Sequence, residues 1–367
     1  MIPFFGAGRE FKAYGPKAMA LARRVLSGGR WLQSEDVSLF EARLAAFTGR
    51  KFGVAVNSCT DALYFALVAA GVKPGDEVLV TDYSFVASAS PILRAGAVPV
   101  FVDIDSDHLM DLDNARALAG PKTKALVLVH LYGQMADPQA AEAFAKERNL
   151  ILIEDAAQAI GSTRGGRKAG SLGLASTISF DPTKPISAPG SGGILLTDDE
   201  ETAARVRRLR YHGKAADRAE YLEPGFNCQM PSLTAALLNM KMDFERPWLK
   251  ARRKAADAYR AGLSRASGLV LPREIEPGTH IYHKFVVRHP RRDALRRHLG
   301  ERGIETMVHY SLPLHKQPCF KPYARLDDLY PRAMAASREA LSLPIHPFLT
   351  KRETAAVVKA VLEFTGT

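Results

Sequence analysis

The sequence predicts an α/β fold, in which a mostly parallel sheet of seven strands lies between helices and a smaller α+β domain follows. Short β-branched runs alternate with helical patterns from about residue 53 to residue 200. Such alternation is typical of parallel sheets that helices cover on both faces. After a long helical stretch, strand and helix patterns mix without regular alternation. A chain of 367 residues is long enough for a large domain and a smaller companion.

The expected strands of the sheet are short and rich in Val, Ile and Leu. They are Gly53–Val56, Glu77–Thr81, Val98–Val102, Ala125–Val129, Leu150–Ile153, Thr177–Phe180 and Gly193–Leu196. The segments between them carry apolar residues at helical spacing. These expected helices are Asp61–Ala70, Ala87–Ala95, Asp113–Ala119 and Pro138–Arg148.

A helical stretch from Ser232 to Ser264 is expected to bridge two domains. It is interrupted at Arg246–Trp248, where Pro247 would kink or restart the helix. We therefore expect a large domain over residues 1–245 and a small domain over residues 246–367. The small domain is expected to contain strands at Tyr282–Val287 and Glu305–Val308, and helices near Asp293–Arg302, Pro331–Leu341 and Lys351–Phe364.

Composition narrows the functional classes. The formal charge is +11, which would favour a substrate that carries phosphates. Nucleic-acid binding is the competing interpretation of this charge. The basic residues, however, lie in mixed segments that are typical of solvated helix faces. No apolar run approaches the roughly 18 residues of a membrane span. Met1–Gly6 lacks the pattern of a secretory signal. The three cysteines are widely spaced, which argues against disulfides and a zinc site. We expect a cytoplasmic protein without a metal, a membrane partner or a nucleic-acid partner.

Four segments at strand ends carry residues suited to chemistry. Asn57–Ala62 offers small hydroxyl residues and backbone N–H groups at a helix start, which suit a phosphate, although ordinary helix capping is the favoured explanation of this segment by itself. Asp155 follows an apolar strand and needs a partner such as a protonated ring nitrogen, or else caps a helix. Lys184 follows another strand, where burial would make it a nucleophile; most lysines are simply exposed. Gly190–Gly193 permits close backbone approach.

The order and spacing of these segments resemble the DegT/DnrJ/EryC1/StrS family of sugar-nucleotide aminotransferases. The resemblance covers nearly the whole chain. It is carried by Asn57–Leu63, Pro74–Val78, Pro99–Asp105, His130–Gln134, Glu154–Ala159, Ser179–Lys184, Gly192–Gly193, His212–Gly213, Gly225–Asn227, His309–His315 and Leu343–Ile345. The resemblance implies an aspartate-aminotransferase-like fold and a homodimer with shared active sites.

The resemblance also implies a cofactor, pyridoxal 5′-phosphate, with its pyridoxamine form as an intermediate state. Lys184 would hold the cofactor as a Schiff base and shuttle a proton, and Asp155 would keep the ring nitrogen protonated. Gln158 would contact the ring oxygen and Phe85 would stack on the ring. The phosphate would be held by Ser58, Cys59, Thr60 and Ser179, and by Asn227 of the neighbouring subunit.

By the same resemblance, the reaction would be a ping-pong transfer of an amino group, by family habit from L-glutamate, to a keto sugar linked to a nucleoside diphosphate. The resemblance places Arg30, His309, Tyr310 and His315 on the substrate side, although a structural role is an equal alternative for the two histidines. Ser191 and Gln229 depart from the family pattern and leave the sugar undetermined, including amination at C3 or C4.

Two other functions compete with transamination. A family branch that dehydrates sugars replaces the Schiff-base lysine with histidine, and the presence of Lys184 argues against it. A relative that binds the cofactor or a sugar nucleotide without catalysis, as a sensor or scaffold, would bind cofactor but show no reaction with glutamate.

Overall fold

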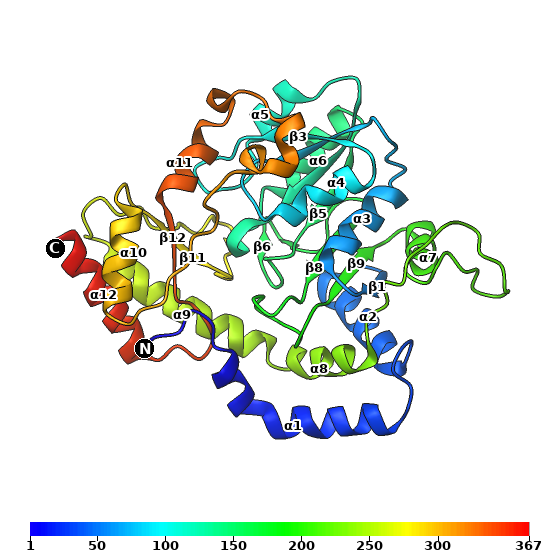
Figure 1. Ribbon diagram of the computed structural model, residues 1–367, viewed down its shortest axis with the longest axis horizontal. Helices are drawn as coiled ribbons and strands as arrows, with labels where there is room; N and C mark the ends of the chain where they lie inside the picture. The colour runs from blue at the N-terminus through cyan, green and yellow to red at the C-terminus, as the bar shows by residue number, and fades with distance from the viewer. Residues whose placement is uncertain (367) are drawn as a thin grey trace.

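In the computed structural model, which describes residues 1–366, a seven-stranded sheet forms the centre of the larger part of the chain (Figure 1). Its spatial order is β1-β9-β8-β5-β4-β2-β3. Strand β9 runs antiparallel to both of its neighbours, and the pairings among β2, β3, β4, β5 and β8 are parallel. The strands are β1 Phe52–Val56, β2 Glu77–Thr81, β3 Val98–Val102, β4 Thr123–Val129, β5 Ile151–Asp155, β8 Ala175–Ser179 and β9 Gly193–Thr197. All seven expected strands are present, so the predicted mostly parallel sheet is confirmed.

Helices cover both faces of this sheet, because successive strand residues point to opposite sides. Leu79 of β2 belongs to the core under α2, α5, α6 and α8, whereas its neighbours Val78 and Val80 belong to the core under α3, α4, α7 and α11. The helices are α2 Glu35–Thr48, α3 Cys59–Ala69, α4 Ser90–Arg94, α5 Leu112–Leu118, α6 Pro138–Glu147, α7 Glu200–Leu209, α8 Ser232–Met242 and α11 Pro331–Glu339. Burial on both faces explains why the strands read as continuous apolar runs.

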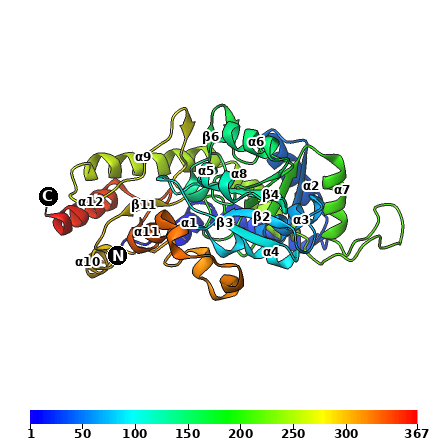
Figure 2. The same ribbon diagram turned by 90° about the horizontal axis from the view of Figure 1, so that it is seen from above.

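The chain passes between its two parts through two helices in succession, α8 and α9 Glu245–Leu263 (Figure 2). The predicted interruption exists, but it lies at Asp243 and Phe244 and not at Pro247. Pro247 instead sits in the first turn of α9, where its missing N–H would have no partner within the helix anyway. We propose a domain boundary between residues 245 and 246, in the first turn of α9 and just after this break.

The small domain has its own apolar core, formed mainly by α9, α10 Arg292–Glu301, α12 Lys351–Thr365 and a two-stranded sheet. That sheet pairs β11 Phe285–Arg288 with β12 Ala340–Leu343. The prediction of a strand at Glu305–Val308 was wrong. This segment makes only an isolated bridge, from Met307 to Ser342, and the strand that pairs with β11 is β12. The first residues of the chain join this part, since Ile2 bridges to Ile304.

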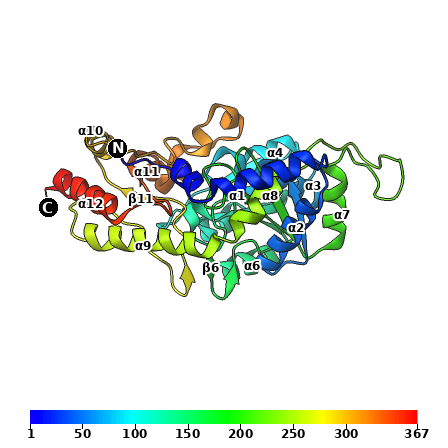
Figure 3. The same ribbon diagram turned by 90° about the horizontal axis from the view of Figure 1, so that it is seen from below.

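The remaining elements lie at the edges of the two parts. Helix α1, Ala7–Ser27, packs on α8 and crosses the front of the molecule in Figure 3. A small three-stranded sheet has the order β10-β6-β7. Its strands are β10 Gly278–Thr279, β6 Thr163–Arg164 and β7 Arg167–Lys168. Short 3₁₀ helices occur at Val86–Ser88, Leu131–Gly133, Leu314–Lys316, Pro318–Tyr323 and Asp327–Leu329. A search of the helices among residues 1–366 for one that is both long and apolar enough to cross a membrane finds none.

Candidate active site

The residues singled out from the sequence meet at the carboxyl ends of neighbouring strands. Asp155 is the last residue of β5, and it pairs in register with Thr177 of the adjacent strand β8. The chain leaving β8 carries Ser179 and then Lys184. The chain leaving β1 carries Ser58. In parallel sheets this edge is where ligands bind, so the fold itself brings these side chains to one place.

Asp155 is a buried carboxylate held by two donors. Ser88 Oγ donates to its Oδ2 at 2.7 Å, and the backbone N–H of Ala157 donates to Oδ1 at 3.1 Å. Burial raises the pKa of Asp155, while these hydrogen bonds and the charge of Lys184 oppose that rise. No Lys or Arg ammonium or guanidinium group of residues 1–366 pairs with it within 4.0 Å. A buried acid of this kind is suited to a cationic ring nitrogen.

Lys184 lies in the loop between β8 and β9. The backbone N–H of Lys184 donates to the carbonyl of Asp181 at 2.9 Å, which forms a turn in this loop. Its side-chain amine has no carboxylate within 4.0 Å among the described residues. Burial lowers the pKa of Lys184, against the charges of Cys59, Asp155 and Asp181. A buried amine with a lowered pKa is available as a nucleophile toward an aldehyde.

The start of α3 forms a cradle for an anion. Ser58 caps the helix by accepting from the backbone N–H of Asp61 at 3.1 Å. The backbone N–H groups of Cys59 and Thr60 donate to no acceptor among residues 1–366. A Cβ on Gly193, which begins β9, would lie 2.3 Å from the Ser58 carbonyl carbon and 2.4 Å from Cys59 N. Only glycine therefore fits there, and the helix start is pressed against β9 with free N–H groups exposed to a ligand.

Ser179 and Thr60 border this cradle. Ser179, at the end of β8, pairs in register with Gly193, which also pairs with Val56 at the end of β1. Its hydroxyl accepts a long hydrogen bond of 3.3 Å from Asp181 N. The predicted phosphate-binding residues Ser58, Cys59, Thr60 and Ser179 are thus gathered at the junction of three neighbouring strands.

Gln158 joins the large domain to the small domain beside the lysine loop. It is buried, its Oε1 accepts from Tyr132 N at 3.1 Å, and its Nε2 donates to the Tyr310 hydroxyl at 3.4 Å. His283 of the small domain lies 3.1 Å from Gln158 Oε1 and 3.1 Å from the carbonyl oxygen of Thr183. The sequence offered no local sign of this role for His283, because it depends on contacts between segments far apart in the chain.

Phe85 follows β2 and leaves half of its side chain exposed, at 52%. Its ring centroid lies 6.2 Å from that of Tyr310. A large exposed aromatic side chain next to a buried polar cluster has an open face on which a second ring can stack.

His309 and Tyr310 are fixed in place by two tyrosines of the large domain. Tyr83 OH donates to the carbonyl of His309 at 2.9 Å, and Tyr132 OH donates to the same oxygen. Tyr310 N donates back to Tyr83 OH at 2.7 Å. Burial and the charges of Lys284 and Lys184 lower the pKa of His309 to about 3. His309 is therefore a neutral imidazole near neutral pH, and its Nδ1 lies 2.8 Å from Ser342 Oγ of β12.

His315 is buried and hydrogen-bonded on both ring nitrogens. Nδ1 lies 2.6 Å from Asp82 Oδ2, and Nε2 lies 3.3 Å from Asp327 Oδ1. Its ring stacks on Tyr330 at 4.5 Å. Although burial opposes the charged form, the hydrogen bonds and charges of Asp82 and Asp327 raise the pKa of His315. These contacts connect the residue after β2 to the 314–330 segment, which supports the structural interpretation of His315.

Replacing His315 with leucine is expected to destabilise the fold. The change leaves the fully buried Asp82 carboxylate without its partner, and breaking a buried ion pair in this way costs about 3–5 kcal/mol. Urea unfolding of the purified protein measures the loss. The matched change Asp327→Asn removes the charge of an exposed carboxylate that pairs with His315 and Lys316, and it should cost much less because exposed ion pairs are screened by water. Equal, small losses for both variants would contradict a structural role for His315.

Arg30 and Asn227, the other predicted site residues, are exposed. Arg30 follows the end of α1, and Asn227 bridges through its backbone to Tyr211. Neither makes a side-chain hydrogen bond or ion pair within residues 1–366. The fold of one chain does not bring them to Lys184 through any direct contact.

Sequence comparison relates the chain to known proteins over almost its full length. The sequence profile of the DegT/DnrJ/EryC1/StrS aminotransferase family matches residues 13–362. The chain is 40% identical to a pleiotropic regulatory protein of Geobacillus stearothermophilus, over 99% of this chain and 98% of that protein. It is 36% identical to the dTDP-3-amino-3,4,6-trideoxy-alpha-D-glucose transaminase of Streptomyces venezuelae, over 99% of this chain and 96% of that protein.

Structural comparison gives the same result. The X-ray crystal structure of S. venezuelae DesV superimposes with a TM-score of 0.97 at 36% identity, and the match covers 100% of this chain and 99% of that chain. At this similarity the two chains share the whole fold, including the small domain.

Proposed function

This chain belongs to the DegT/DnrJ/EryC1/StrS aminotransferase family, and we propose that it transfers an amino group to a keto sugar carried by a nucleoside diphosphate. The observation that carries the proposal is the combination of an unpaired buried amine at Lys184, a buried carboxylate at Asp155 and a backbone cradle at the start of α3. These three features are the chemical requirements of a transaminase that uses pyridoxal 5′-phosphate.

The residues of this site fit that cofactor. The free N–H groups of Cys59 and Thr60 suit its phosphate, and Gly193 keeps them accessible. Ser58 and Ser179 would add hydroxyl groups, Phe85 would stack on the ring, and Gln158 would contact the ring oxygen. When bound, the cofactor supplies a ring that withdraws electrons from the carbon at which a proton is removed.

The residues of this chain then have distinct tasks. Asp155 would face the ring nitrogen and, as an anion, would favour its protonated form. Ser88 and the Ala157 amide orient the carboxylate. The Lys184 amine would hold the cofactor and move a proton. The second task needs a neutral amine, which burial favours. His309 and Tyr310 would bound the substrate side.

We propose L-glutamate as the amino donor and a nucleoside-diphosphate sugar with a keto group at C3 or C4 as the acceptor. The name of the S. venezuelae relative, a transaminase of a dTDP sugar, supports the acceptor class. The net charge of +11 favours a substrate with phosphates. Arg30 would meet the diphosphate.

Absorption spectra recorded during the two separate half-reactions test this function. Glutamate added to the cofactor-loaded protein should remove the visible absorption of the pyridoxal form, and a panel of 3-keto and 4-keto sugar nucleotides should restore it selectively. A protein that binds the cofactor but fails to react with any amino acid would instead act as a cofactor-binding regulator. The regulatory name of the 40% identical relative makes this control necessary.

We propose that two copies of the chain form a homodimer with shared active sites. Large apolar side chains on and after α1 are exposed: Phe11, Met19, Leu26, Trp31 and Leu32. Exposed apolar clusters of this extent mark interaction surfaces. The loop after α7 extends well beyond the body of the molecule (Figure 1), and Asn227 at its base is exposed. In a dimer these features would reach the partner, where Asn227 would contact the cofactor phosphate.

A hybrid of two inactive variants is expected to regain activity. Lys184→Ala removes the amine, and Asn227→Asp places a negative charge beside the phosphate, so each variant alone should be nearly inactive. If the two residues of one site come from different subunits, a co-expressed hybrid contains one intact site per dimer. Its activity should reach about half of the wild-type value. Two-tag purification isolates this hybrid, and a hybrid no more active than its parents would contradict the shared site.

A further inference from the structure

A small cavity lies behind the loop that carries Lys184. Its volume is about 30 Å³, and its walls come from residues 5–10, the 182–187 loop, Arg252, Lys284 and residues 345–348. The cofactor-site residues Ser58, Phe85 and Asp155 do not line it. The cavity therefore shares the lysine loop and His283 with the cofactor site, while its other walls come from different residues.

Two cations in this wall lack an acidic partner. Lys284 has 4% of its surface exposed and Arg252 has 6%. Within residues 1–366, neither has a carboxylate within 4.0 Å. The Lys284 ammonium lies instead over the rings of Phe4 and Phe5, at 5.0 and 4.6 Å from their centroids. Aromatic faces attract a cation weakly and leave most of the cost of its burial uncompensated.

Polar atoms in the same wall also lack partners. Arg252 uses Nη1 to donate to the carbonyl oxygens of Ile345 at 2.9 Å and Tyr282 at 3.4 Å, but its Nε is buried without a hydrogen bond in the described chain. Both ring nitrogens of His346 are likewise buried, and no side chain of the described residues hydrogen-bonds them, although the Pro3 backbone lies near the ring. Buried polar atoms in proteins are rarely left in this state unless a water or an ion satisfies them.

The only carboxylate that lines the cavity within residues 1–366 is already engaged. Glu10 Oε1 lies 2.5 Å from the Lys241 ammonium, and Tyr14 donates to the same oxygen. Glu10 and Asp181 act on Arg252 and Lys284 respectively only from a distance, so neither cation of this wall has a carboxylate in direct contact. Burial and the charges of Lys184 and Arg252 lower the pKa of Lys284, and an anion in the cavity would counteract that shift.

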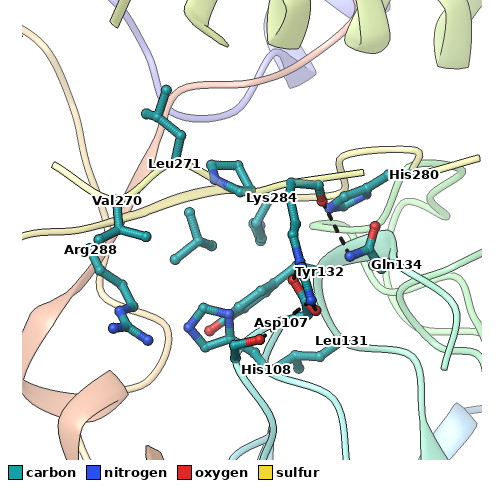
Figure 4. Close-up of a pocket in the computed structure, with 14 residues that line it drawn as sticks. Asp107, His108, Leu131, Tyr132, Gln134, Val270, Leu271, His280, Lys284 and Arg288 are labelled. Atoms are coloured by element: carbon teal, nitrogen blue, oxygen red, sulfur yellow. Dashed lines mark hydrogen bonds and ion pairs between the residues drawn. The ribbon is translucent and has the colours of Figure 1, made fainter. Parts of the chain in front are cut away.

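Figure 4 shows a neighbouring cavity that Lys284 also lines, together with His108, Tyr132, Gln134 and Arg288. Its charged neighbours are more nearly balanced, since Arg273 pairs with Asp107 and Arg288 with Glu339. The Lys284 ammonium lies beside Phe4 and Phe5, of which Phe5 lines the cavity behind Lys184. The unpaired positive charge is therefore assigned to the cavity behind Lys184 and not to the cavity of Figure 4.

We propose that the cavity behind Lys184 is a binding site for a small monovalent anion, of halide or carboxylate size, held by Lys284 and Arg252. A volume of about 30 Å³ holds roughly two water-sized groups, which excludes the cofactor phosphate and a sugar nucleotide. The anion could have two sources: a free ion such as chloride, or the side-chain carboxylate of the amino donor. The second source rests on the proposed function, whereas the first does not.

Thermal unfolding of the cofactor-loaded protein tests the site with bromide and formate as probes. Sodium gluconate at equal ionic strength is the reference, because its anion is too large for the cavity. At ten times the dissociation constant, either probe should raise Tm by about 2 °C relative to gluconate. Lys284→Met, which keeps a side chain of similar length between the two phenylalanines, should lose this rise. Lys250→Met removes an exposed charge of α9 and should retain it.

An equal rise in wild type and Lys284→Met, or no rise in wild type, would overturn the proposal. Should Lys284→Met fail to fold, wild-type crystals soaked in bromide decide the matter, since an anomalous peak between Lys284 and Arg252 is expected and its absence rejects the site. Glutamate half-reactions then distinguish the sources: bromide raises the apparent dissociation constant of glutamate several-fold if the donor's carboxylate enters the cavity, and leaves it unchanged if a free ion does. A protein that shows the bromide shift but no half-reaction would refute the proposed function and leave the anion site intact.

Discussion

Replacing Lys184 with alanine is expected to leave a protein that binds the cofactor reversibly but no longer holds it or reacts with glutamate. Loss of the amine removes both the attachment point and the group that moves the proton. The proton-transfer contribution alone is about 10²- to 10⁴-fold in rate, and loss of the covalent attachment adds to it. Dialysis should strip the cofactor from the variant, and its visible absorption should be absent.

The fold should survive this change, because the Lys184 side chain makes no hydrogen bond or ion pair within residues 1–366. Lys146→Ala, at an exposed position near the end of α6, is the matched control and should behave as wild type. Single-turnover reactions with glutamate measure the rates. A Lys184→Ala variant with a rate within tenfold of wild type would contradict the assigned role.

Replacing Asp155 with asparagine is expected to lower the half-reaction rate by a factor of about 10² to 10⁴, comparable to the loss of a catalytic acid or base. Asparagine keeps the shape, and its single oxygen can still accept from Ala157 N while its NH2 group donates to the Ser88 hydroxyl. It cannot stabilise a protonated ring nitrogen by its charge. Burial raises the pKa of Asp155, so removing its charge should not destabilise the cofactor-free fold. Rapid-mixing spectroscopy and urea unfolding measure the two effects separately.

Ser88→Ala provides a graded comparison for Asp155. It removes one hydrogen bond to the carboxylate, which is worth about 1.5 kcal/mol, or roughly tenfold. The expected order of rates is therefore wild type, then Ser88→Ala, then Asp155→Asn. An Asp155→Asn variant that is faster than Ser88→Ala would show that the carboxylate charge is not what the reaction needs.

The central sheet could be predicted from sequence because its strands are buried on both faces. Short runs that are mostly apolar or β-branched then identify each strand without any knowledge of its partners. In the small domain this signal failed. The residues Ala340–Leu343 continue an alanine-rich helix, and only the pairing with Phe285–Arg288 makes them a strand. Strand formation there depends on tertiary contacts and not on local pattern.

The candidate site could be predicted in part for the same reason. Lys184, Asp155 and the Asn57–Ala62 segment follow strands, so the position of each strand also locates the residue after it. Ser88, His283 and Lys284 were not predicted. Ser88 lies in a short 3₁₀ helix of small residues, and its contact with Asp155 spans 67 positions. His283 and Lys284 come from the small domain, where no local pattern indicates which side chains face the lysine loop.

His315 illustrates the limit of motif-based assignment. The sequence motif that contains it suggested a place on the substrate side, with a structural role as an equal alternative. Its fully buried contact with Asp82 depends on a pairing 233 positions away. A motif can be preserved in one chain for either reason, and only the surroundings of the side chain distinguish them.

The claim that Lys184 holds pyridoxal 5′-phosphate is tested most directly by reducing the cofactor-loaded protein with borohydride, which fixes the cofactor to the lysine that carries it. After digestion, mass spectrometry should find the added mass on the peptide that contains Lys184 and on no other lysine peptide. Glutamate added before the reduction should prevent the modification. Recovery of an unmodified Lys184 peptide, or of the modification on a different lysine such as Lys284, would contradict the assignment.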